Sequence, residues 1–195
     1  GEMNNSGKAH PILEKSLRYC QEKNVLVIAA AGNDGCACLH IPGAFPTVLV
    51  VGGMDEKGNP LEFSNWGREY WAKGILAPAE NIPGAVGEIE TALKTGTSYA
   101  TPIVSGIAAL LLSIQKQQGV SLNPTVVREA LLESADGCGH WESLSCQKLL
   151  KGRLNIKNSF SIIQHKKGIT MQELQQSVTL LQTPEKPGPE AIQLQ

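Results

Sequence analysis

A single serine stands out as a candidate nucleophile because of the residues on either side of it. Ser98 lies in the small, polar stretch 95–102, which runs directly into the apolar residues 103–112. Proline fits the first turn of a helix, so Pro102 predicts that a buried helix begins close to Ser98. Backbone N–H groups at a helix N-terminus are unpaired and favour negative charge, which suits a reacting hydroxyl. Serine is also a common helix N-cap, and that role needs no chemistry.

A second polar stretch supplies a candidate partner for Ser98. The apolar residues 25–28 predict a buried strand, and Ala-Gly-Asn-Asp-Gly follows at 31–35. In an open α/β sheet, binding sites form at the carboxyl ends of the strands. The side-chain amide of Asn33 is therefore expected at that edge of the sheet. We expect Ser98 and Asn33 to face one shared cavity.

Together the two stretches resemble the subtilisin-like serine proteases. In that family, G-T-S-x-A-[ST]-P carries the nucleophile, which matches Ser98, and the A-G-N that closes a core strand carries the oxyanion donor, which matches Asn33. The resemblance covers about residues 8–163 and implies a three-layer α/β fold around a central parallel sheet. Further matches follow in the family's order at 45–55, 63–67, 75–78 and 151–156, the last with Arg153 in place of a glycine.

A narrower resemblance is to the subtilases of cyanobactin biosynthesis. It rests on C-A-C-L-H-I-P at 36–42, F-S-N-W-G at 63–67 and G-T-S-Y-A-T-P-I-V-S-G at 96–106. Those proteases cut the leader or tail from a ribosomal precursor peptide, and one type also macrocyclises it. The resemblance therefore implies a serine endopeptidase that acts on a peptide substrate and needs no cofactor.

The acid and the base of the family's Asp-His-Ser triad are missing from the pattern. In the family both precede the oxyanion strand, whereas this chain begins only a helix and a strand before Asn33. Neither His10 nor His40 stands in the family's H-G-x-H context. We expect His10 at the surface and His40 in a structural hydrogen bond. The chain thus resembles the C-terminal half to two-thirds of a protease domain, its N-terminal part missing, and is expected to be inactive alone.

Two other functions stay open at this point. One is a non-catalytic module that keeps a peptide-binding sheet after losing its triad. The other is an α/β-hydrolase esterase, since Ser98, Asp136 and His140 fall in that family's chain order. Against the esterase, Ala100 replaces the second glycine of G-x-S-x-G, and the Asp–His gap leaves no room for separate loops.

Length and composition limit which other classes of function are expected. The 195 residues, 42% hydrophobic and 18% charged, suit one soluble globular domain. A net charge of -1 gives no reason to expect nucleic acid or a membrane surface as a partner. The longest apolar run, around 103–114, is too short to span a bilayer, and the N-terminus lacks the order of a signal peptide. We expect a cytoplasmic protein.

The five cysteines leave one question open. Cys20 lies on an expected helix as a core thiol. Cys36 and Cys38 share a loop, but no second pair stands at ligand spacing, so we expect no metal site, zinc included. Cys138 and Cys146 bracket a short polar loop. They form either a local disulfide or, in a cytosolic protein, two reduced thiols.

Apolar periodicity and turn residues place the elements that must position these residues. Residues 1–165 are expected to form the C-terminal portion of a peptidase domain, and 166–195 a helix followed by a disordered tail. Expected are helices at 8–23, 98–116 and 123–135, parallel strands at 25–30 and 47–52, short strands within 61–78, a polar loop at 79–94, a cysteine-bearing loop at 137–150 and a closing segment at 152–164.

Overall fold

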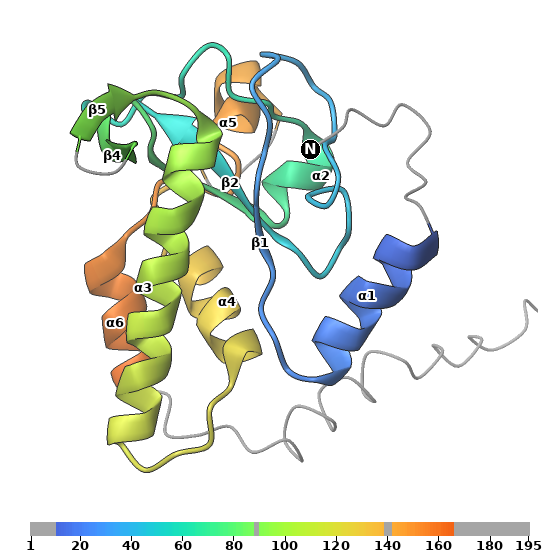
Figure 1. Cartoon of the computed structure of the whole chain (residues 1–195), viewed down its shortest axis with the longest axis vertical. Coiled ribbons are helices and arrows are strands. Elements are labelled where there is room, and N and C mark those ends of the chain that lie inside the picture. Colours follow the sequence, from blue (N-terminus) through green and yellow to red (C-terminus); the bar gives the residue numbers. More distant parts are fainter. Residues whose placement is uncertain (1–10, 88–89, 139–141, 166–195) are drawn as a thin grey trace, which may run out of the picture.

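The centre of the fold is a parallel sheet of three strands (Figure 1). The structure, a computed structural model, describes residues 11–87, 90–138 and 142–165. The strands lie in sequence order, with Ala29 opposite Val50 and Val51 opposite Ile75. This confirms the parallel pairing expected from the two apolar runs. The strands are β1 (Ile28–Ala30), β2 (Leu49–Met54) and β3 (Gly74–Pro78).

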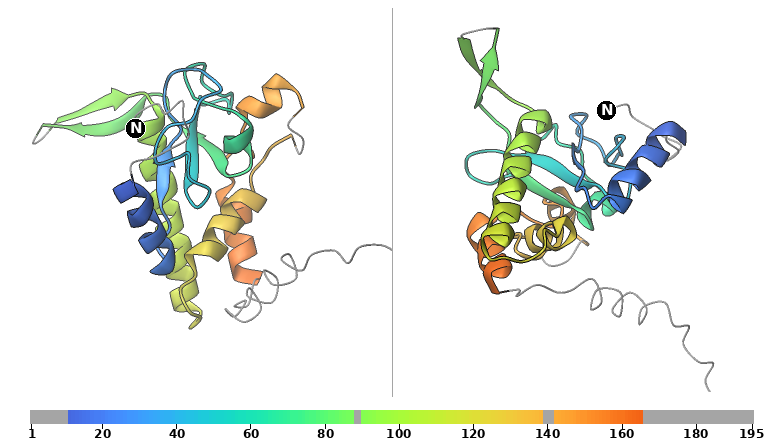
Figure 2. Two further views of the ribbon diagram at one scale, coloured as in Figure 1. Left: turned by 90° about the vertical axis from the view of Figure 1, so that its right-hand side faces the viewer. Right: turned by 60° about the horizontal axis from the view of Figure 1, so that its bottom comes forward.

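Helices cover both faces of the sheet, which confirms the three-layer fold (Figures 1 and 2). On one face, Leu49 and Val51 pack against α3, α4 and α6. On the other, Val50 packs against Tyr70 of α2, and Leu17 of α1 packs beside Val48. Successive residues of β2 face opposite layers, so the whole strand is apolar. The helices are α1 (Pro11–Glu22), α2 (Arg68–Trp71), α3 (Thr97–Gln117), α4 (Pro124–Glu133), α5 (Leu144–Lys148) and α6 (Ile156–His165).

The central helix α3 begins at Thr97, close to Ser98 as expected. Gly96, with a φ of 149°, turns the chain into the helix as its N-cap, so Pro102 lies in the second turn and not the first. Proline has no N–H, and the carbonyl of Ser98, four residues earlier, therefore loses its helical donor. By length and composition α3 is the one helix among the described residues that is able to cross a membrane. Its inward face instead packs along all three strands.

The stretch 79–94 was expected to be a polar loop, and this is wrong. It forms an antiparallel hairpin of β4 (Ile82–Val86) and β5 (Glu90–Lys94), which projects from the body of the molecule (Figure 2). Pro83 and Gly84 are poor strand formers, so local propensity gave no strand signal. The ring of Tyr99 lies beside Gly84 and links the hairpin to the start of α3.

The stretch 61–78 contains one strand, β3, preceded by the short helix α2, and not several short strands. The helix is fixed by a tertiary contact. The buried Tyr70 hydroxyl accepts a hydrogen bond from the backbone N–H of His40 at 2.6 Å and donates one to the Ala31 carbonyl at 3.2 Å. Such contacts join residues some thirty positions apart, so no local pattern shows them.

The C-terminal elements largely follow the expectations. Asn123 caps α4 by accepting the N–H of Val126 at 3.2 Å, with Pro124 as the first helical residue. The closing segment extends the sheet beside β3, where the N–H of Leu76 donates to the Gly152 carbonyl at 2.8 Å, and then becomes α6. The expected helix and tail at 166–195 lie outside the described residues, so the domain division stays a prediction.

The question left open for Cys138 and Cys146 has an answer in the structure. Their sulfurs are joined in a disulfide whose Cα atoms are 5.6 Å apart. The expected cysteine-bearing loop also contains α5, whose N-cap Ser143 accepts the N–H of Cys146. Cys20 is the free cysteine and is partly buried.

Candidate active site

Ser98 is the second residue of α3, and it is exposed to solvent. Its place in the first turn means that its own N–H has no i−4 acceptor within the helix. The Gly96 N-cap has no side chain to accept that N–H. The start of α3 thus presents an exposed hydroxyl at Ser98, where the N–H of Tyr99 donates to the Gly96 carbonyl at 2.9 Å.

Asn33 follows β1 and is bound to the residue that precedes Ser98. Its Oδ1 accepts two hydrogen bonds from Thr97, from the N–H and from the hydroxyl, each at 2.9 Å. A backbone N–H only donates, so the atom facing it is Oδ1, and Nδ2 is the end of the amide left to donate elsewhere. The structure thus brings Asn33 to the start of α3. Its Nδ2 and the Ser98 N–H are suited to hold one oxygen anion.

The loop that carries Asn33 is paired with the segment before α2. The Gly32 carbonyl accepts the N–H of Asn65 at 3.1 Å, and the N–H of Asp34 donates to Asn65 Oδ1 at 2.8 Å. Asn65 Nδ2 donates to Asp34 Oδ2 at 3.0 Å. Neither Thr97 nor Asn65 was predicted from the sequence to have a role. The signal available was their place inside the family motifs G-T-S and F-S-N-W-G.

His40 lies against this loop and not against Ser98. Its Nε2 is 2.6 Å from Asp34 Oδ2, and its side chain is 12% exposed. The contact is an ion pair when His40 is protonated. The hydrogen bond from Asn65, aided by His40, holds the pKa of the Asp34 carboxyl below its usual value.

No histidine within the described residues hydrogen-bonds to Ser98. His165 lies at the end of α6, where its Nδ1 is 2.6 Å from the Ser161 carbonyl. His10 and His140 lie outside the described residues. Asp136, the acid of the esterase alternative, accepts the Asn155 amide with both its oxygens, at 3.1 and 3.0 Å. Within the described residues, the structure therefore brings Asn33 to the start of α3 without a histidine hydrogen-bonded to Ser98.

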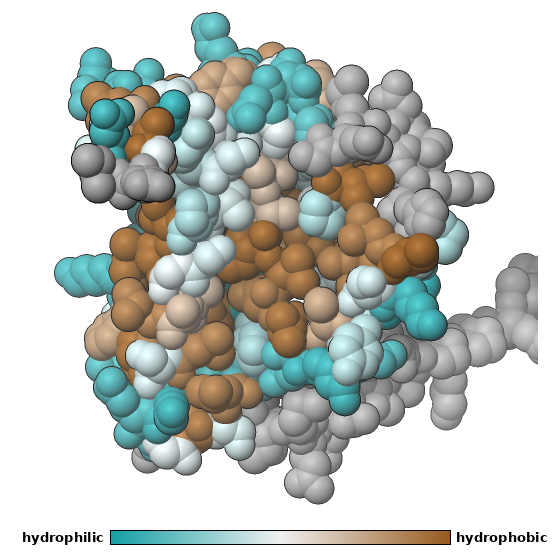
Figure 3. All heavy atoms as spheres, viewed as in Figure 1, coloured by the Kyte–Doolittle hydropathy of each residue, from teal (hydrophilic) through white to brown (hydrophobic). Residues whose placement is uncertain are grey.

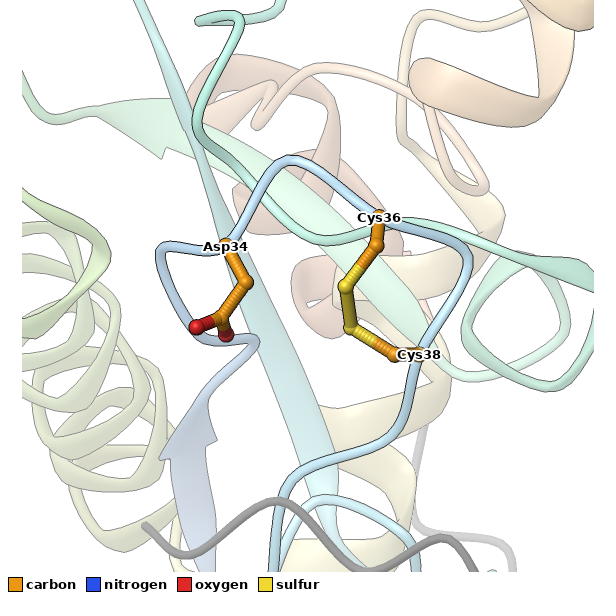
Figure 4. Close-up of side chains that lie close together, drawn as sticks. All are labelled: Asp34, Cys36 and Cys38. Atoms are coloured by element: carbon orange, nitrogen blue, oxygen red, sulfur yellow. A yellow bond between two sulfur atoms is a disulfide. The ribbon is translucent and has the colours of Figure 1, made fainter.

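Cys36 and Cys38, in the same loop, are joined in a disulfide with Asp34 beside them (Figure 4). The carboxylate oxygen and the two sulfurs lie within 4.8 Å of one another, which suits metal ligands. Sulfurs in a disulfide offer no thiolate, so this group is not a metal site in its oxidised form. This disulfide was not predicted from the sequence, although the two cysteines stand in a C-x-C pattern.

Comparison with known proteins shows which family this chain matches. Residues 2–172 match the subtilase family, peptidase S8. Among curated proteins, M-protease of Shouchella clausii (strain KSM-K16) is 33% identical over 128 residues, which are 66% of this chain and 32% of that protein. The thermophilic serine proteinase of Bacillus sp. (strain AK1) is 36% identical over 124 residues, 64% of this chain and 29% of that protein.

Solved structures give a closer similarity. The prenylagaramide maturation protease PagA is 49% identical, with a TM-score of 0.79, over 84% of this chain and 59% of its own. The patellamide maturation protease PatA is 49% identical, with a TM-score of 0.80, over 84% and 60%. The PatG macrocyclase in complex with peptide is 36% identical, with a TM-score of 0.77, over 83% and 49%. The chain thus spans about three-fifths of PagA and PatA and about a third of M-protease.

Proposed function

The chain belongs to the subtilase family, and from this premise we propose that it carries the nucleophile and the oxyanion donor of a serine endopeptidase. Ser98 Oγ attacks the scissile carbonyl of a peptide. A histidine takes the serine proton, and an aspartate holds that histidine in the required tautomer. Asn33 Nδ2 and the Ser98 N–H stabilise the oxyanion. The observation that carries this proposal is the pair of hydrogen bonds that ties Asn33 to Thr97.

The histidine and the aspartate are proposed to come from polypeptide outside these 195 residues. β1 pairs with β2 alone in the described sheet and so leaves one strand edge open to a further strand. Hydrophobic side chains gather on the face shared by α3, β1 and α1 (Figure 3). Among exposed apolar residues, Leu110 of α3 is 65% exposed and Val25, before β1, is 53% exposed. An open strand edge beside an apolar surface suits the packing of more protein.

The substrate proposed is a ribosomal precursor peptide, cut during maturation. Support comes from the identity to PagA and PatA, 49% over 84% of the chain, against 33% for M-protease over 66%. The lower identity to the PatG macrocyclase, 36%, favours cleavage over macrocyclisation. A cytoplasmic location, where ribosomal peptides are made, belongs to the same proposal, although disulfides such as Cys36–Cys38 and Cys138–Cys146 are more common outside the cytosol.

A fluorophosphonate probe, which labels activated serines, tests the proposal. The 195-residue chain is expected to stay unlabelled, because losing the base of a subtilisin-type site costs about a million-fold in rate. A longer form that includes the natural upstream sequence is expected to label, and Ser98→Ala to abolish the labelling. Ser105→Ala removes another exposed serine of α3 and should label normally.

Two outcomes would contradict the proposal. Labelling that survives Ser98→Ala in the longer form assigns the nucleophile to another residue. A folded longer form that does not label supports the non-catalytic peptide-binding module instead.

A further inference from the structure

Asn65 touches both neighbours of Asn33 and not Asn33 itself. Its N–H donates to the carbonyl of Gly32 at 3.1 Å, and its Oδ1 accepts the N–H of Asp34 at 2.8 Å. Its Nδ2 donates to the Asp34 carboxylate at 3.0 Å. Asn65 is 1% exposed, so its own end of each of these bonds is buried, whereas the Asp34 side chain is 43% exposed. The backbone on either side of Asn33 is therefore fixed by one buried residue.

The chemistry at position 65 requires an amide. A single planar group accepts from the Asp34 N–H through one atom and donates to the Asp34 carboxylate through the other. An aspartate there would keep the acceptor but lose the donor, and it would set a second negative charge against Asp34. An aliphatic residue would leave the Asp34 N–H without this acceptor.

The loop fits Asn65 because position 32 is a glycine. Gly32 has a φ of 106°, and a Cβ at this position would overlap Asn65 Nδ2 and lie 2.9 Å from two ring atoms of His40. Two further backbone bonds continue the pairing. The Gly35 N–H donates to Phe63 at 2.7 Å, and the Trp66 N–H donates to Cys36 at 3.1 Å. Hydrogen bonds with the segment 63–66 thus hold the loop 32–36 in place.

We infer that Asn65 is a positioning residue for the oxyanion donor Asn33. Thr97 holds the tip of the Asn33 side chain, and Asn65 holds the backbone at its base. An oxyanion donor acts only when its N–H lies about 2.7–3.1 Å from the developing charge, so a small shift of the loop is costly. Asn65 touches no substrate in this scheme and acts through Asn33 alone.

The inference rests on the proposed function and predicts a particular kinetic pattern. The oxyanion exists only in the transition state and the tetrahedral intermediate. Disturbing its donor therefore lowers kcat and leaves KM nearly unchanged. A residue that only stabilised the fold would lower the active fraction and the melting temperature, without changing kcat per active site.

The experiment uses the longer, active form, with peptide hydrolysis normalised to active sites counted by fluorophosphonate titration. Asn65→Asp is expected to lower kcat about 10- to 100-fold and to change KM less than about three-fold. Asp34→Asn combined with Asn65→Asp reverses the donor and the acceptor, so it is expected to recover most of the lost kcat. Asn59→Asp is the matched control. It makes the same change beside a carboxylate, Asp55, in an exposed turn, and should leave kcat unchanged.

A double-mutant cycle separates positioning from a general structural effect. Asn65→Ala is expected to lower kcat in the natural background and to change it less than about two-fold when Asn33→Ala is already present. Equal losses in both backgrounds would overturn the inference, as would a reversed pair no better than Asn65→Asp alone. If Asn65→Ala does not fold, the reversed pair decides. If Asn33→Ala itself leaves kcat unchanged, the oxyanion role of the proposed function fails, which is a different result.

Discussion

Asn33 Oδ1 accepts both hydrogen bonds that Thr97 is able to donate toward it, at 2.9 Å from the backbone nitrogen and 2.9 Å from the hydroxyl. The two residues are 64 positions apart, and Thr97 is fully buried. Thr97, the residue before the proposed nucleophile Ser98, therefore sets the direction of the Asn33 amide, the proposed oxyanion donor. One contact couples the end of β1 to the start of α3.

Thr97→Val tests this coupling, because valine keeps the shape and the N–H but loses the hydroxyl. Removing one of the two bonds costs about 1 kcal/mol, so kcat of the longer form should fall about five- to ten-fold with little change in KM. Thr97→Ser keeps the hydroxyl and should stay within about two-fold of the natural enzyme. A valine variant as fast as the natural enzyme would contradict the role of the hydroxyl. A serine variant as slow as the valine variant would show that packing of the methyl group contributes as well.

The features predicted correctly from the sequence are mostly those with a local cause. The apolar run at 47–52 predicts β2 because both its faces are covered, and Asn123-Pro124 predicts the start of α4 because cap and first residue are adjacent. The meeting of Asn33 and the start of α3, which are far apart in the chain, was expected from the family resemblance of the two stretches and from the rule that sites form at the carboxyl ends of strands. Sequence reasoning did not find the bonds of Asn65, which join residues about thirty positions apart. It also missed β4 and β5, whose glycine and proline oppose a strand.

The Cys138–Cys146 disulfide closes a loop with a sequence separation of eight and should contribute measurably to stability. For a loop of this length, the entropy lost by the unfolded chain corresponds to about 2–3 kcal/mol. Replacing both cysteines by serine should lower the free energy of unfolding of the 195-residue chain, measured in urea, by that amount. Cys20→Ala, which breaks no crosslink, serves as the control. No difference between the double variant and the control would mean that the two thiols are reduced in solution.

Gly152 is expected to tolerate no side chain. It has a φ of 156°, and a Cβ there would lie 2.6–2.8 Å from backbone atoms of Asp136 and Gly137, which cannot move aside as a side chain does. Gly152→Ala should therefore lower the free energy of unfolding by about 2–3 kcal/mol. Gly106→Ala is the matched control, because this glycine lies within α3 with open space around it, and alanine should stabilise that helix by up to about 1 kcal/mol. Equal effects of both changes in urea denaturation would contradict the close approach at Gly152.

Lys73 should make stability depend on pH. It is 7% exposed, and its ammonium donates to the carbonyls of Ala44 and Phe45 at 2.8 and 2.7 Å, without a carboxylate bond. Burial, with Arg128 adding to the effect, lowers the pKa of Lys73 from 10.5 to about 8. Between these two values the unfolded chain holds a proton that the folded chain has lost, so the free energy of unfolding rises with pH. The cost of burying the charge is full below about pH 8 and relieved toward pH 10.5.

Urea denaturation of the natural chain and of Lys73→Met at pH 7.5, 8.5 and 9.5 measures this dependence. The variant leaves two carbonyls without a donor and should be less stable at every pH. The quantity to compare is therefore the slope of the free energy of unfolding against pH. Stability of the natural chain should rise relative to the variant by on the order of 1–2 kcal/mol across the range. Tyr70 does not interfere, because burial raises its pKa above the usual value and its unfolded counterpart ionises near pH 10. Parallel pH profiles of the two proteins would show that Lys73 keeps its proton in the fold.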